Sequence, residues 1–264
     1  MLWFLIMLGV ALVISAIGFY KYVYFISLGY GFSVAAIGVT SLIAFRENLS
    51  AATIIFCILF VVYGLRLSGY LLIREIVSSS YRNKMKTEIK DGKTMKFIAK
   101  FFIWITCALL YACQTAPLYF RLYNDAETNV SLLIGMSIMF IGVAIESIAD
   151  IQKNAAKKKA PNHFVSSGLY RLVRCPNYLG EMLFWTGVIV SAIGALTNVL
   201  SWIIAITGYL GIIYVMFSGA RRLELRQNRT YGQDPEYQAY VKKTPIMVPF
   251  IPLYSVASQK WLIG

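Results

Sequence analysis

The chain has 264 residues, of which 58% are hydrophobic and 14% are charged, and its mean hydropathy is +0.65. This composition excludes an ordinary soluble domain and predicts an all-α, multispanning membrane protein. The formal net charge of +13 indicates topology and contact with anionic lipid rather than binding to nucleic acid. One histidine and four cysteines without metal or disulfide spacing argue against a metal centre and a Ser-His-Asp site.

Seven apolar segments are long enough to cross a membrane. They cover residues 2–19, 22–44, 51–73, 101–120, 130–151, 177–194 and 199–218. The first is read as a span and not as a signal peptide, because no basic region precedes it. The hairpin between the last two spans, around Thr197 and Asn198, is very short and is the weakest point of this division.

The connecting segments differ in charge. Residues 74–100 carry net +5, residues 153–174 carry six basic and no acidic side chains, and residues 219–264 carry net +4, whereas residues 121–129 carry net −1. The basic segments follow the third, fifth and seventh spans, so all lie on one side. The positive-inside rule makes that side cytoplasmic. We therefore expect a multipass protein of the cell membrane with a cytoplasmic C-terminus.

Polar side chains occur inside the third span. Tyr63, Arg66 and Tyr70 share one helix face, and Arg66 lies in the middle of the span. An arginine at that depth needs a polar partner or a polar cavity. The alternative is an arginine that snorkels between two packing tyrosines.

The end of the fifth span carries two carboxylates. Glu146 and Asp150 are four residues apart and share a face with Gly142, which permits close helix contact. Such a pair can do acid–base chemistry or hold hydroxyl and amino groups. The alternative is a pair held by basic side chains that fixes helix packing.

A helix is predicted to start at Pro176, directly after two arginines. Its free backbone N–H groups together with Arg171 and Arg174 suit a phosphate or another anion. Asn177 and Glu181 share a face of this helix. The alternative is that the arginines contact lipid phosphates while Asn177 forms hydrogen bonds within a bundle.

The last segment contains a short capped helix. Asp234 is a suitable N-cap, Pro235 suits the first position, and Thr244-Pro245 ends the helix. This basic, aromatic tail could lie on the membrane surface or close over a bound cofactor.

Three of these motifs together resemble a known family. Residues 168–181 read Gly-Leu-Tyr-Arg-Leu-Val-Arg-Cys-Pro-Asn-Tyr-Leu-Gly-Glu. They resemble the signature of the steroid 5-alpha-reductase C-terminal-domain group, also called the DUF1295 membrane proteins. Residues 146–153 and 231–249 resemble its other two blocks in the same order. That group shares a superfamily with isoprenylcysteine carboxyl methyltransferases and sterol reductases.

The resemblance implies a seven-span helical fold that binds NADPH on the cytoplasmic side of spans five to seven. Residues 1–129 would then be the substrate side, and residues 130–264 the cofactor-binding region and tail. Tyr63 resembles the tyrosine that polarises the substrate carbonyl. The candidate cofactor-binding residues are Arg66, Glu146, Asp150, Arg171, Arg174, Asn177, Glu181, Arg222 and Tyr231.

Two departures from the family pattern limit what can be carried over. Cys175 stands where the family motif has histidine, and the Gln-Glu pair of an early span in steroid reductases is not evident, which argues against a steroid substrate. We expect an NADPH-dependent reductase of a conjugated C=C bond in a lipid-like substrate. The alternatives are an S-adenosylmethionine-dependent membrane methyltransferase and a non-catalytic membrane protein with a decayed cofactor site. The oligomeric state stays open.

Overall fold

The computed structural model describes residues 2–77 and 95–263, and this part of the chain contains helices and no strands. Within these described residues, six helical segments are long and apolar enough to cross a membrane. They are α1 (Leu2–Ser15, extended by a 3-10 turn to Phe19), α2 (Leu28–Ala44), α3 (Ala51–Val77), α5 (Phe97–Gln114), α7 (Val130–Lys159) and α9 (Val199–Tyr231). Helix α8 (Pro176–Ser191) corresponds to the sixth predicted span and has 16 residues. The predicted all-α membrane fold is confirmed.

The predicted fourth span ends too late. Helix α5 ends at Gln114, and a separate helix, α6 (Ala116–Tyr123), follows after Thr115. Pro117 occupies the first turn of α6. Its missing N–H cannot continue the hydrogen bonds of α5, so the chain breaks there. Most of the basic loop predicted after the third span, residues 78–94, lies outside the described residues.

The chain forms two compact units. The N-terminal unit consists of Met1–Met136 with Val188–Tyr209, and the C-terminal unit consists of Ser137–Gly187 with Leu210–Gly264. Helices α7, α8 and α9 each contribute to both. The division into a substrate side and a cofactor side, at residues 129 and 130, stays a prediction.

In the N-terminal unit, α2 and α3 approach closely at small residues. A methyl group added to Gly31 would lie 2.7 Å from the carbonyl oxygen of Gly64. Ser68 of α3 donates to the carbonyl oxygen of Leu28 at 3.0 Å. Small side chains and a hydroxyl that bonds to the neighbouring backbone are the usual means of packing membrane helices. This contact fixes the face of α3 that carries Tyr63.

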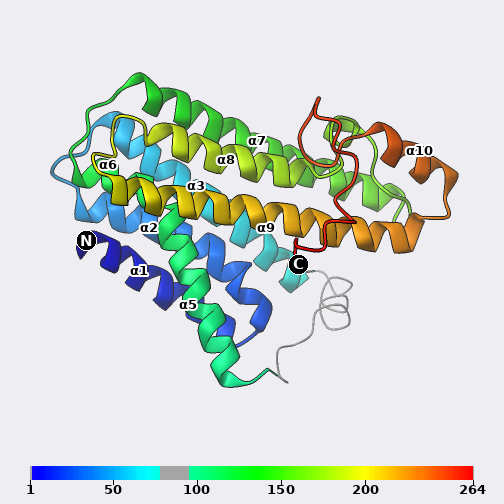
Figure 1. Cartoon of the computed structure of the whole chain (residues 1–264), viewed down its shortest axis with the longest axis horizontal. Coiled ribbons are helices and arrows are strands. Elements are labelled where there is room, and N and C mark those ends of the chain that lie inside the picture. Colours follow the sequence, from blue (N-terminus) through cyan, green and yellow to red (C-terminus); the bar gives the residue numbers. More distant parts are fainter. Residues whose placement is uncertain (1, 78–94, 264) are drawn as a thin grey trace. The chain divides into compact units, whose positions relative to one another are not determined.

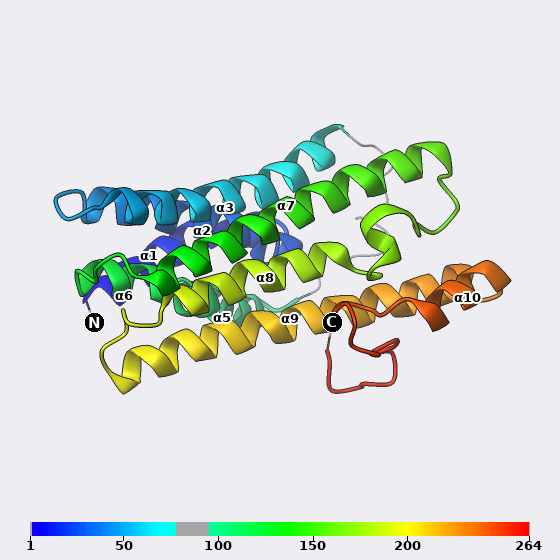
Figure 2. The same ribbon diagram turned by 90° about the horizontal axis from the view of Figure 1, so that it is seen from above.

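In the C-terminal unit, α7, α8 and α9 run side by side (Figures 1 and 2). Helices α7 and α8 touch at two glycines, since a methyl group on Gly180 would lie 2.7 Å from the carbonyl oxygen of Gly142. Helix α10 (Pro235–Lys243) follows α9. Asp234 caps it by accepting a hydrogen bond from the Glu236 amide at 2.9 Å, as the sequence predicts.

The tail after α10 packs back onto the start of α8. The amides of Arg174 and Cys175 donate to the carbonyl oxygens of Pro245 and Ile246, both at 2.9 Å. Beneath this pairing lies a cluster of buried side chains. Its members are Cys175, Ala220, Ile246, Met247, Val256 and Leu262. The tail is therefore part of the folded C-terminal unit.

Candidate functional site

Two predicted site residues meet where α7 and α8 lie together. Asn177, in the first turn of α8, donates from Nδ2 to Oδ1 of Asp150 on α7 at 2.6 Å. The phenol of Tyr170 donates to Oδ1 of Asn177 at 3.0 Å. Carboxylate, amide and phenol thus form one hydrogen-bonded group, which we call the Asp150–Asn177–Tyr170 network. Asp150 and Asn177 are half-buried.

A glycine turn brings Tyr170 to this network. Gly168 has a φ of +63° and begins the 3-10 helix η3 (Gly168–Arg171). Gln152 of α7 accepts a hydrogen bond from the Leu169 amide at 2.8 Å. A side chain at position 168 would be strained by this φ and would collide with the Gln152 carboxamide. The glycine of the motif therefore has a local conformational reason.

Aromatic side chains hold helix α10 against the turn that carries Tyr170. Tyr240 donates from its hydroxyl to the Tyr170 carbonyl oxygen at 2.6 Å. The Phe164 ring lies 5.3 Å from the rings of Tyr237 and Tyr240, and 6.0 Å from that of Tyr231. Burial raises the pKa of the Tyr240 phenol, so this hydroxyl stays protonated and keeps donating. Tyr231, a predicted site residue, lies in this cluster, and Lys157 donates to its hydroxyl at 3.1 Å.

The other two predicted carboxylates are buried deeper in the helix contact. Glu146 of α7 packs against Gly180, because a methyl group there would lie 2.7 Å from the glutamate Cγ. Glu181 of α8 follows Gly180 directly and is also buried. Carboxylates at such depth are costly unless polar groups stabilise them. Their proposed contact with cofactor atoms stays a prediction.

Arg174 is engaged inside the protein. Its Nη2 donates to Oε1 of Glu224 at 2.8 Å and to the Tyr254 carbonyl oxygen, and both charged side chains are 1% exposed. The second Glu224 oxygen accepts from the Val256 amide at 2.9 Å. Arg174 therefore fastens the tail to α9. The predicted phosphate contact would require this ion pair to open, so we now expect a positioning role for Arg174.

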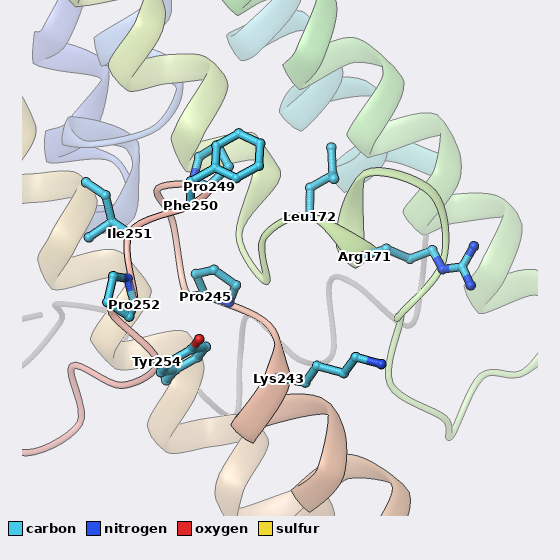
Figure 3. A pocket seen from close by; sticks show the side chains of 9 residues that line it. All are labelled: Arg171, Leu172, Lys243, Pro245, Pro249, Phe250, Ile251, Pro252 and Tyr254. Atoms are coloured by element: carbon cyan, nitrogen blue, oxygen red, sulfur yellow. The ribbon is translucent and has the colours of Figure 1, made fainter.

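Arg171 has different surroundings. It is exposed and lines a pocket of about 260 Å³ (Figure 3). The other lining residues are Leu172, Lys243, Pro245, Pro249, Phe250, Ile251, Pro252 and Tyr254. Arg222 is exposed on α9. Of the predicted cationic residues in this unit, Arg171 and Arg222 are accessible to an anion and Arg174 is not.

Cys175 is a core residue. It is buried in the tail cluster, and burial raises the pKa of its thiol to about 12. A thiol of that pKa is protonated at neutral pH and is a poor nucleophile. The position of the missing family histidine is thus filled by a small apolar side chain.

Tyr63 and Arg66 belong to the N-terminal unit. Tyr63 is fully buried, and its hydroxyl lies 2.8 Å from the Tyr30 hydroxyl of α2. The Tyr30 ring lies 5.1 Å from Tyr111, whose hydroxyl donates to the Phe25 carbonyl oxygen at 2.6 Å. Arg66 is half-buried on α3. Tyr30 was not among the residues singled out from the sequence, and its contact with Tyr63 appears only in the fold.

The chain is similar to a described protein family and to several known proteins. The family model described as "Protein of unknown function (DUF1295)" matches residues 13–244. The chain is 27% identical over 157 residues to "Very-long-chain enoyl-CoA reductase" of Dictyostelium discoideum, covering 57% of this chain and 47% of that protein. No solved structure matches it significantly.

Two further relatives are named for steroids. Identity to "3-oxo-5-alpha-steroid 4-dehydrogenase 1" of Rattus norvegicus is 22% over 167 residues, covering 62% of this chain and 59% of the relative. Identity to "Steroid 5-alpha-reductase DET2" of Gossypium hirsutum is 25% over 137 residues, covering 49% and 48%. The chain thus spans about half the length of the curated relatives it matches.

Proposed function

This chain belongs to the DUF1295 family, and from that premise we propose that it is a membrane reductase of a conjugated carbon–carbon double bond in a lipid-like substrate. Two relatives are named as reductases and one as a steroid dehydrogenase. The observation that carries the proposal furthest is the Asp150–Asn177–Tyr170 network. It gathers amide, carboxylate and phenol groups within the motif that resembles the cofactor-binding signature.

We propose NADPH as the cofactor, and the chemistry of the accessible residues fits it in part. Beyond its bonds to Asp150 and Tyr170, the Asn177 amide keeps one N–H and one oxygen lone pair, which suit the carboxamide of a nicotinamide. Arg171 and Lys243 are exposed cations that line one pocket and suit a phosphate. The pocket volume of about 260 Å³ is below the range of roughly 300–1,000 Å³ typical of whole ligands. A dinucleotide would therefore extend beyond this pocket.

The remaining residues have narrower proposed roles. Glu146 and Asp150 would hold polar cofactor atoms, and Glu181 would join Asn177 at the nicotinamide carboxamide. Arg222 and Tyr231 would contribute from α9. Arg66 joins them as a candidate from the N-terminal unit. NADPH, when bound, would supply the hydride that adds to the β-carbon of the double bond, and a proton would then add at the α-carbon.

Tyr63 would polarise the substrate carbonyl and stabilise the developing enolate by donating a hydrogen bond. The Tyr30 hydroxyl lies 2.8 Å from that of Tyr63, and either can donate to the other; the proposed role requires Tyr63 to donate to the substrate. A preorganised donor of this kind contributes roughly 10²–10³ in rate.

The orientation of the chain is proposed from its charges. Lys157, Lys158 and Lys159 end α7, and four basic residues follow the apolar part of α9, so these ends are placed on the cytoplasmic side of the cell membrane. Cysteine labelling at Lys158 from the cytoplasmic side, and at Asn124 from the other side, checks this placement. Labelling of both positions from one side would contradict it.

Calorimetric titration of the detergent-purified protein tests the cofactor class. We expect binding of NADPH, weaker binding of NADH, and no binding of S-adenosylmethionine. Binding of S-adenosylmethionine alone would replace the proposal with a methyltransferase. Binding of neither would indicate a membrane protein with a decayed cofactor site.

A further inference from the structure

The end of the chain lies beside a membrane-spanning segment. Tyr214 belongs to the apolar part of α9, seven residues before Arg221. Its hydroxyl donates to the Trp261 carbonyl oxygen at 3.0 Å and accepts from the Ile263 amide at 3.2 Å. Figures 1 and 2 both show the red end of the chain next to the middle part of α9. The tail therefore returns toward the membrane after leaving it.

The depth of this contact follows from helix geometry. Seven residues correspond to about 10 Å along a helix, and the headgroup region on each side of a bilayer is roughly 5–8 Å thick. Arg221 is a charged residue at the headgroup level, where it donates to the carbonyl oxygens of Ala257 and Leu262 at 3.1 and 3.2 Å. Tyr214, about 10 Å deeper, then lies just inside the acyl-chain region. Residues 257–263 lie between these two levels.

The tail separates inward-facing from outward-facing apolar side chains. Leu262 is 1% exposed in the core cluster, whereas its neighbours Trp261 and Ile263 are 64% and 79% exposed. Ile246 is buried, whereas Phe250 is 97% exposed. Within residues 2–77 and 95–263, Phe250, Trp261 and Ile263 are left largely exposed, and this pattern is typical of an interfacial membrane segment.

The backbone at Phe250 has an unusual conformation. Its φ is +67°, in the left-handed region that bulky residues rarely adopt. Figure 3 shows Phe250 and Leu172 at one end of the pocket and Lys243 at the other. Phe250 therefore stands exposed at the rim of this pocket.

We propose that residues 245–263 are an interfacial membrane anchor, with Phe250, Trp261 and Ile263 inserted into the surface of the bilayer that holds the spans. The bilayer is favoured over a second copy of the chain because the exposed flank of α9, with Leu210 and Val215, must already face lipid. The anchor continues that flank. Exposed Lys260 complements anionic headgroups. The proposal does not depend on the reductase activity.

Spin labelling of the full-length protein tests the anchor. Phe250→Cys and Ile263→Cys are made with Cys107 and Cys113 replaced by alanine, because those two thiols are only partly buried. The labelled proteins are reconstituted in phosphatidylcholine–phosphatidylglycerol vesicles. Both labels should collide with oxygen, which concentrates in lipid, several-fold more often than with a water-soluble nickel chelate. Gln233→Cys, on the exposed turn before α10, is the matched control and should show the opposite preference.

A second measurement needs no cysteine. Brominated lipids should quench a tryptophan contribution that is lost in Trp261→Phe, and quenching should be strongest with bromine near the headgroup. Collision preferences at positions 250 and 263 equal to that at position 233 would overturn the anchor. Spin–spin broadening at these positions that disappears on dilution with unlabelled protein would assign the surface to a second copy of the chain instead.

Discussion

Glu224→Gln should destabilise the C-terminal unit, because it removes the charge that compensates a buried guanidinium. The Glu224 side chain is 1% exposed and accepts from Arg174 at 2.8 Å and from the Val256 amide at 2.9 Å. Breaking a buried ion pair from one side costs about 3–5 kcal/mol. For a chain of this size, such a loss lowers the melting temperature by roughly 6–20 °C. The assay is thermal unfolding of the purified protein in detergent.

Two controls separate this loss from a general effect of mutation. Glu47→Gln removes a carboxylate from an exposed pair with Arg46, whose atoms are 3.9 Å apart, and should change stability by less than about 1 kcal/mol. Arg174→Met combined with Glu224→Leu removes both buried charges. This double variant should recover most of the stability that Glu224→Gln loses. A deficit of about 1–3 kcal/mol should remain, because the Val256 amide is left without its acceptor. Equal melting temperatures for Glu224→Gln and the parent would refute the tail-fastening role of Arg174.

Three other changes probe separate parts of the account. Arg171→Ala should raise the dissociation constant for NADPH about 10- to 150-fold with little change for NADH, since a charge-assisted hydrogen bond contributes roughly 1.5–3 kcal/mol; equal losses for both cofactors in titrations would remove Arg171 from the 2′-phosphate. Cys175 should resist alkylation in the folded protein, and rapid labelling at pH 8 would show that its thiol is accessible. The free energy of unfolding should fall as pH rises from 9.0 toward about 12, because folding raises the thiol pKa over that window. Tyr63→Phe should lower kcat by roughly 10²–10³ without loss of NADPH binding, and full activity of that variant in a turnover assay would exclude Tyr63 as the polarising group.

Helix periodicity and capping made much of the fold predictable. Apolar segments of spanning length gave the membrane helices, and Asp234 with Pro235 gave the start of α10. The early end of α5 was missed because hydropathy continues through Pro117 while the backbone hydrogen bonds do not. The family resemblance predicted from three motifs is confirmed by the match to residues 13–244.

The polar residues of the candidate site could be picked out from their spacing along single helices. Their partners in loops and on other helices could not. Asp150 and Asn177 were singled out, and the structure brings them into contact. The role of Tyr170 depends on the positive φ of Gly168, which sequence periodicity does not report. The partner of Arg174 lies 50 residues away on α9, and no local pattern indicates such a pairing. Charge alone therefore suggested a phosphate ligand where the fold forms an ion pair.

Titration of Asn177→Ala with NADPH and NADH tests the central claim most directly, because Asn177 joins the network at both of its amide atoms. Asn162→Ala, at an exposed loop position, is the matched control. The account predicts weaker binding of both cofactors to Asn177→Ala with an unchanged NADPH-to-NADH ratio, and unchanged binding to Asn162→Ala. Dissociation constants for Asn177→Ala within about twofold of the parent would contradict a cofactor site at the Asp150–Asn177–Tyr170 network.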